Sequence, residues 1–116
     1  MSRNRASAKA AGTSWETEIC RTLIAAGWPH AERRRLSGAY DRGDVAGVVG
    51  VVIEAKNTTK LDISAALNEA TVEAKNAGAR IGAAWIKRRG KASAADGYVV
   101  IDGTTFMQLL KEAGYQ

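Results

Sequence analysis

Apolar residues recur along this chain with two different periods, which predict helices and strands. A helical period runs through residues 13–26, 62–77 and 104–113. Short runs rich in Val, Ile and aromatic residues, typical of strands, occupy residues 28–36, 44–50, 51–56, 80–87 and 98–101. Gly27 and Gly78 follow the first two helical segments, where glycine commonly ends a helix. The predicted order is therefore α-β-β-β-α-β-β-α, an α/β domain with a central mixed sheet flanked by helices.

The first predicted helix, capped by Thr13 or Ser14, carries a carboxylate on its apolar face. At about 100° per residue, the apolar stripe consists of Trp15, Ile19, Cys20, Leu23 and Ala26. Glu16 falls inside this stripe, whereas Glu18 projects to the opposite, solvated side. An unpaired carboxylate that faces the core is costly, although Glu16 can also complement the helix dipole. We therefore take Glu16, and not Glu18, as a candidate site residue.

Residues 43–56 contain the other charged residues that we take as candidates for a site. Its two Val-rich runs, separated by glycines, predict a β-hairpin whose second strand is central in the sheet. Side chains alternate along a strand, so Glu54 and Lys56 project to the same side, and Asp44 comes close to Glu54 across the hairpin. Charges at such a strand are costly unless they are paired or hold a metal. The alternative is an ordinary surface ion pair between Glu54 and Lys56.

The two later helices also have apolar faces that we expect to pack on the sheet. Asp62 or Ser64 caps the first of them, and its face is mostly alanine: Ile63, Ala66, Leu67, Ala70, Ala74 and Ala77. Thr104 caps the terminal helix, whose inward face is expected to consist of Phe106, Leu109, Leu110 and Ala113.

Length and composition set the broad class. At 116 residues the chain forms a single domain, which we place at residues 13–116, after a loose basic arm at residues 1–12. A single cysteine, Cys20, and a single histidine, His30, argue against a disulfide framework and a Cys/His zinc site. We expect a reducing, cytoplasmic setting. The sequence has no secretory leader pattern and no apolar run long enough to span a membrane.

The net charge of +5 favours a polyanionic partner, of which nucleic acid is the most common. The basic residues lie in the arm, in an arginine-rich strand and the loop after it, and in a turn after the fourth strand. The candidate phosphate contacts are Arg3, Arg5, Arg33, Arg34, Arg35, Arg42, Lys60, Lys87, Arg88, Arg89 and Lys91. For any single arginine in the strand, a solvated edge protected by charge is an equal alternative.

These residues occur in the order of a known nuclease pattern. The chain has Glu16 on the first helix, then Gly43-Asp44-Val45-Ala46, then Val52-Ile53-Glu54-Ala55-Lys56. In this it resembles the PD-(D/E)XK nuclease superfamily and, within it, the archaeal-type Holliday-junction resolvases and their phage relatives, over roughly Gly12 to Gly90. Three departures are Gly43, where the family usually has proline, a hairpin between Asp44 and Glu54 that is shorter than in the archaeal enzymes, and the lack of a counterpart to the glutamine sometimes found on the following helix.

The resemblance implies a restriction-endonuclease-like core, α-β-β-β-α-β, and a metal-dependent endonuclease that nicks four-way DNA junctions as a homodimer. It implies Asp44, Glu54, Glu16 and the Ala55 carbonyl as ligands of Mg²⁺, for which Mn²⁺ can substitute. Lys56 would orient the attacking water and stabilise the transition state, and Ser37 would help to position the scissile phosphate. The expected location is the cytoplasm, which is the host cytoplasm if the chain is phage-encoded.

Two alternatives stay open. A nuclease of the same fold could act on flaps, general duplex DNA or RNA. A non-catalytic nucleic-acid-binding module would show salt-sensitive binding without cleavage that depends on a divalent cation. An acid–base or acyl-transfer enzyme is disfavoured, because Cys20 and His30 have no evident nucleophile–base partners in the sequence.

Overall fold

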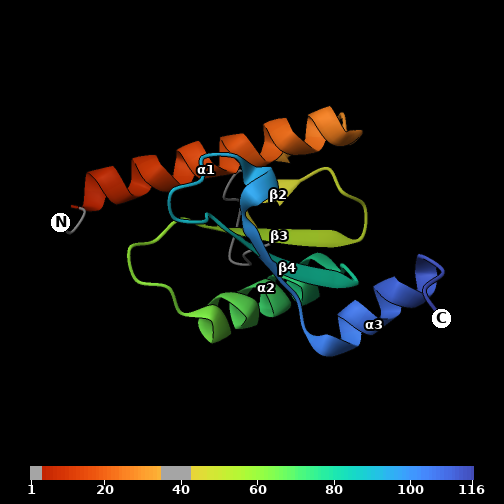
Figure 1. Cartoon of the computed structure of the whole chain (residues 1–116). Helices are drawn as coiled ribbons and strands as arrows, with labels where there is room; N and C mark the ends of the chain where they lie inside the picture. The colour runs from red at the N-terminus through yellow and green to blue at the C-terminus, as the bar shows by residue number, and fades with distance from the viewer. Residues whose placement is uncertain (1–3, 35–42) are drawn as a thin grey trace.

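The computed structural model describes residues 4–34 and 43–116, and its elements follow the predicted order (Figure 1). They are α1 (Arg5–Ala26), β1 (Glu32–Arg33), β2 (Val45–Ala46), β3 (Val51–Lys56), α2 (Ile63–Ala77), β4 (Ile81–Ile86), the 3₁₀ turn η1 (Ala94–Asp96), β5 (Tyr98–Val100) and α3 (Gly103–Glu112). Four candidate residues lie outside the described ranges: Arg3, Arg35, Ser37 and Arg42.

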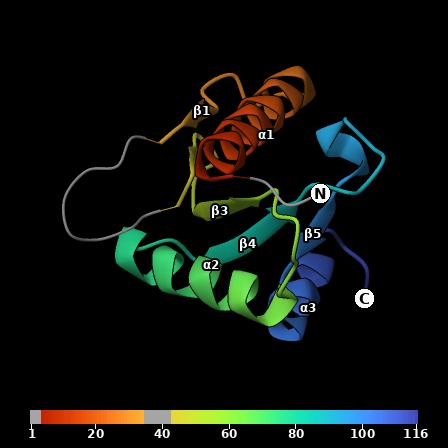
Figure 2. The same ribbon diagram turned by 90° about the vertical axis from the view of Figure 1, so that its left-hand side faces the viewer.

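The described strands form one five-stranded mixed sheet in the order β1-β2-β3-β4-β5. The predicted hairpin is confirmed, with Val45 opposite Ile53, and β3 is the central strand. β3 and β4 run parallel, and α2 connects them. α1 covers one face of the sheet and α2 the other (Figure 2). The chain is therefore an α/β protein with helices on both sides of a mixed sheet, as the pattern predicts.

α1 begins at Arg5 and not at residue 13 or 14, so the expectation of a loose arm is wrong for residues 5–12. The side chain of Asn4 caps the helix by accepting a backbone N–H of its first turn. The alanine-rich stretch that follows has high helix propensity, which extends the helix toward the N-terminus. The predicted end is confirmed, because Gly27 adopts the left-handed conformation at φ 117°. No helix in the described part of the chain is both long and apolar enough to cross a bilayer.

Two hydrophobic layers hold the helices to the sheet. On the α1 side, Trp15, Ile19, Cys20 and Leu23 are buried against β2, β3 and η1, which confirms this part of the predicted stripe. Ala26 is exposed. On the other side, the alanine face of α2 allows close contact with β4. A Cβ at Gly82 would collide with the backbone carbonyl of Ala70, so this approach requires glycine.

Glu18 is not the solvated residue that the helical wheel predicts. Its Oε2 accepts hydrogen bonds from the Ala94 backbone N–H at 2.9 Å and from Thr22 Oγ1 at 3.2 Å. Ala94 belongs to η1, which lies between β4 and β5 and packs on the flank of α1. A helical wheel treats the helix in isolation, so it cannot include a segment from the other end of the chain.

α3 also differs from the prediction. It starts at Gly103, and the Asp102 side chain accepts the Thr105 N–H at 2.7 Å, so Asp102 rather than Thr104 is the cap. None of its residues is buried, and Phe106 and Leu109 are 54% and 36% exposed. The expected inward face is wrong because the helix follows β5, the edge strand, and has no extensive packing against the described elements.

Candidate functional site

The conformation of Gly43 and two hydrogen bonds to the backbone of β3 hold Asp44 beside the central strand. Gly43 has φ 93°, and a Cβ there would lie 2.6 Å from a side-chain carbon of β3, so only glycine fits. The Asp44 N–H donates to the Ile53 carbonyl at 2.9 Å, and Asp44 Oδ2 accepts the Ala55 N–H at 2.9 Å. The hairpin register continues to this pair, which places Asp44 opposite Glu54. The predicted proximity of Asp44 to Glu54 is confirmed.

Glu54 and Lys56 project from β3 toward α2. Ile53 and Ala55 contact the hydrophobic layer under α1, and alternation along the strand therefore turns the residues between and after them to the other face. The Glu54 side chain is 8% exposed, and its Oε1 lies 3.5 Å from Lys56 Nζ. Its Oε2 is buried and has no hydrogen-bond partner among the described residues. A surface ion pair is thus excluded for Glu54.

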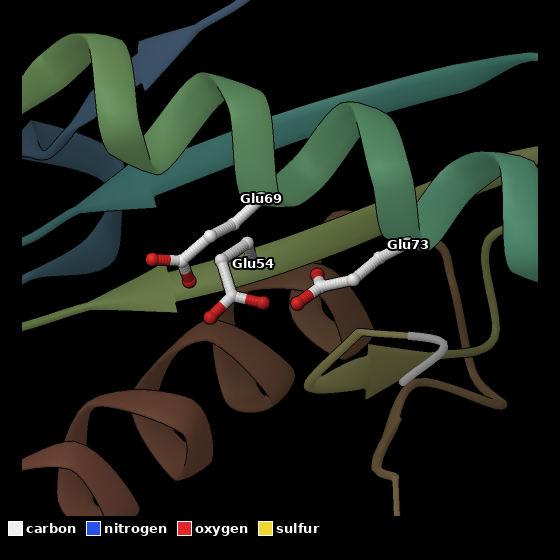
Figure 3. Close-up of side chains that lie close together, drawn as sticks. All are labelled: Glu54, Glu69 and Glu73. Carbon is white, nitrogen blue, oxygen red and sulfur yellow. The ribbon is translucent and has the colours of Figure 1, made fainter. Parts of the chain in front are cut away.

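α2 adds two carboxylates that sequence reasoning missed. Lys56 Nζ lies 2.7 Å from Glu69 Oε2, and Glu73 is 4% exposed. Figure 3 shows the carboxylate of Glu54 between those of Glu69 and Glu73. One carboxylate oxygen from each of the three lies within 4.8 Å of the others. The signal was present: Glu73 falls on the alanine face of α2, three residues after the buried Ala70, just as Glu16 falls on the apolar face of α1.

Burial and crowding change the protonation of this cluster. Burial, reinforced by the Glu54 carboxylate, raises the pKa of Asp44 from 3.8 to about 8. Burial and the adjacent Glu73 raise the pKa of Glu54 from 4.5 to about 8. Burial lowers the pKa of Lys56, but the Glu69 and Glu54 carboxylates outweigh it, and the pKa of Lys56 is raised. The cluster therefore holds protons near neutral pH, and a cation that displaced them would relieve the repulsion.

The donor set suits a hard divalent cation. Carboxylate oxygens are the preferred ligands of Mg²⁺ and Mn²⁺, and the buried Oε2 of Glu54 has no hydrogen-bond donor within residues 4–34 and 43–116. Of the four expected ligands, the structure brings Asp44 and Glu54 together. The Ala55 N–H contacts Asp44, which leaves the expected role of its carbonyl as a prediction. Glu69 and Glu73 are additional candidates that the sequence analysis did not include.

Glu16 is not part of the Glu54, Glu69 and Glu73 group, but it lies near Asp44, and after burial and Glu54 its negative charge also raises the pKa of Asp44. Its Oε2 is 3.0 Å from Arg33 Nε, and its side chain is 19% exposed. It lines a pocket of about 600 Å³ with Asp44, Arg33, Arg34 and Lys9. The predicted inward direction is correct, but α1 covers the opposite face of the sheet from α2, so Glu16 meets an arginine rather than Glu54.

Basic residues border the cluster on two sides. Arg33, Arg34 and Lys9 lie on the Glu16 side. On the other side, the Lys87 N–H donates to the Lys56 carbonyl at 2.9 Å, so the basic turn after β4 leaves the sheet at the same end as Lys56.

The other described candidates for phosphate contact are Lys60, Arg88, Arg5, Arg89 and Lys91. Lys60 lines a smaller pocket with Lys56 and Glu69. Arg88 lies over the Tyr98 ring at 5.6 Å from its centroid. Arg5, Arg89 and Lys91 are exposed.

Searches against protein-family models, curated proteins and solved structures gave no match for this chain. The resemblance to PD-(D/E)XK nucleases stays a prediction drawn from the residues.

Proposed function

We propose that this chain is a metal-dependent, structure-selective DNA endonuclease with a restriction-endonuclease-like core, and that it nicks four-way junctions as a homodimer. One observation carries the proposal. Asp44, Glu54 and Lys56 come together at the central strand, and Glu54 is buried there and does not form an ordinary surface ion pair. Keeping two carboxylates there at a raised pKa costs stability, and such a cost is typical of functional sites.

In this proposal Asp44 and Glu54 hold Mg²⁺ or Mn²⁺, with Glu69 and Glu73 available on α2. When bound, the cation would polarise the phosphate and lower the pKa of an attacking water. Lys56 is held by two carboxylates at 3.5 and 2.7 Å. From there its ammonium group supplies positive charge where negative charge develops in the transition state. Burial of Glu54 and Glu73 limits the screening of their interactions by bulk water.

The arginines bind the nucleic-acid backbone. Arg33 and Arg34 lie at the pocket that Asp44 also lines, and the basic turn that begins at Lys87 lies at the Lys56 end of the sheet. A substrate that contacts both edges would cross the carboxylate cluster. Phosphate contacts of this kind fix the position of the substrate and are sensitive to salt. Arg35, Arg42 and Ser37 lie outside the described residues. For them the proposal keeps the roles predicted from the sequence, which are phosphate contact for the two arginines and positioning of the scissile phosphate for Ser37.

A second candidate is a non-catalytic nucleic-acid-binding module. The observation that favours it is that Lys56 already pairs with Glu69 and Glu54, so the charged groups satisfy one another in part without a metal. In that case the basic edges would be functional and the carboxylates structural.

A substrate panel separates these possibilities. Labelled four-way junction, flap, linear duplex and RNA are incubated with the protein in Mg²⁺ or in chelator. We expect Mg²⁺-dependent nicks in the junction and much slower cutting of the linear duplex. Asp44→Asn should abolish cutting with junction binding retained, whereas Glu32→Gln, at an exposed carboxylate of β1, should cut normally. Equal cutting of the duplex would refute junction selectivity, and salt-sensitive binding without cutting would support the non-catalytic module.

A further inference from the structure

α3 is an amphipathic helix that no element in the described part of the chain covers extensively. It has ten residues, none of them buried, and no extensive packing against another described element. The ion pair between Arg80 and Glu112, at 2.6 Å, ties its last turn to the body of the protein. A helix of this length is marginal in water when it stands alone, because most helical stability comes from packing of the apolar face. α3 therefore requires a covering surface from outside the described chain.

The uncovered face, which we call the α3–β5 face, includes the edge strand from which α3 emerges. Its members are large apolar side chains that are between about one-third and three-quarters exposed: Tyr98, Phe106, Met107, Leu109 and Tyr115. β5 is the last strand of the sheet, so its outer backbone edge has no neighbouring strand among the described residues. Exposed apolar surface beside an open sheet edge marks an interaction site.

The chemistry of this face excludes two kinds of occupant. Nucleic acid needs a cluster of cations, whereas the five members of the face carry none and a single arginine, Arg88, lies over the Tyr98 ring among the described residues. A membrane-surface helix needs lysines or arginines along its polar side, and α3 has Lys111 alone. A protein surface of similar apolar character fits, and a second copy of this chain supplies one by symmetry.

The size of the face agrees with a dimer. A fully buried aromatic side chain contributes about 150–250 Å², so five side chains at these exposures offer on the order of 500 Å² per copy, before backbone and polar rim are included. A standard interface buries about 800 Å² per partner. The apolar side chains of one α3–β5 face thus provide most of what a stable homodimer needs.

We propose that the α3–β5 face is the homodimer interface, with α3 of one protomer covered by the same face of its partner. The choice of a second copy rests in part on the proposed function, because paired nicks in a two-fold junction need two active sites. The exposure of α3 does not depend on it. No residue of the carboxylate cluster belongs to the α3–β5 face, so the interface can be disrupted without altering the site.

Sedimentation velocity on the full chain tests this proposal. We expect wild type to sediment with about twice the mass of one 12.3 kDa chain. Phe106→Asp combined with Leu109→Asp should give monomer with an unchanged β-sheet circular dichroism signal. Val72→Asp is the matched control, because Val72 is 59% exposed on α2, close to the 58% of Met107. This control should stay dimeric. In wild type, α3 amides should exchange hydrogen more slowly at high than at low protein concentration.

Wild type that is monomeric at its highest soluble concentration would overturn the proposal, and so would a dimer that survives the double substitution. Concentration-independent exchange of the α3 amides would overturn it without relying on a variant. The outcomes separate from those of the nuclease proposal. A monomer that still nicks junctions in Mg²⁺ refutes the interface alone, whereas a dimer that dissociates on α3 substitution and cuts nothing refutes the nuclease alone.

Discussion

Replacing Glu54 with glutamine should make the protein more stable as it removes the proposed activity. The folded-state pKa of Glu54 is about 8 against an ordinary 4.5. The folded protein therefore binds a proton more tightly than the unfolded chain does, and wild type loses stability as the pH rises from about 4.5 toward 8. Glutamine has nearly the same shape and does not titrate, so the variant avoids this loss.

The size of the gain follows from the same numbers. A tenfold change in proton affinity corresponds to about 1.4 kcal/mol, so the full rise in the pKa of Glu54 is worth at most about 5 kcal/mol. The ion pair with Lys56, at 3.5 Å, is lost in the variant and reduces the gain. Between about pH 5 and pH 8 we expect the free energy of unfolding of Glu54→Gln, relative to wild type, to increase by about 1–3 kcal/mol.

Urea denaturation in chelator at several pH values measures this difference. Glu69→Gln is the matched control, since it makes the same chemical change in the same cluster at a side chain that is 49% exposed. Its effect should be within about 0.5 kcal/mol of zero at every pH. A Glu54→Gln variant that is less stable than wild type at pH 8, or a difference that does not vary with pH, would refute the reasoning.

Three other variants and one pair test separate parts of the structure. Gly82→Ala should lower the free energy of unfolding by about 1–3 kcal/mol, because the new methyl group collides with α2. Gly12→Ala should raise it by about 0.5–1 kcal/mol, because Gly12 lies within α1 and has open space around it. Urea denaturation of both variants checks the pair, and equal signs would contradict it. Glu18→Ala should lower the free energy of unfolding by about 1–2 kcal/mol, because a buried backbone N–H of η1 loses its acceptor. An unchanged urea midpoint would show that this contact is not stabilising. Lys56→Ala should lower the nicking rate about 10²–10³-fold at saturating Mg²⁺ with junction affinity near wild type, and an unchanged single-turnover rate would remove Lys56 from the site. Arg34→Ala should reduce the slope of log affinity against log salt by about 1 in a binding titration, and a slope identical to wild type would place Arg34 away from phosphate.

The sequence predicts the fold well where local signals and tertiary packing agree. The glycines after α1 and α2 end those helices as expected, and the Val/Ile-rich run of β3 does lie at the centre of the sheet. Each of these features depends on a few neighbouring residues, on backbone conformation or on simple alternation. The pairing of Asp44 with Glu54 follows from hairpin register, which is also a local property.

The errors occur where a distant segment decides the outcome. Glu18 binds η1, which lies at the other end of the chain. The terminal helix has a clear apolar face, but the sheet ends beside it, so Phe106 and its neighbours stay exposed. Periodicity shows that a face is apolar and cannot show whether anything covers it.

Incubation of a labelled four-way junction with the wild-type protein, with and without Mg²⁺, tests the central claim most directly. The account predicts symmetric nicks near the junction centre in Mg²⁺, none in chelator, and none with Asp44→Asn at matched binding. A junction that is bound at low salt and stays intact at every Mg²⁺ and Mn²⁺ concentration would contradict it.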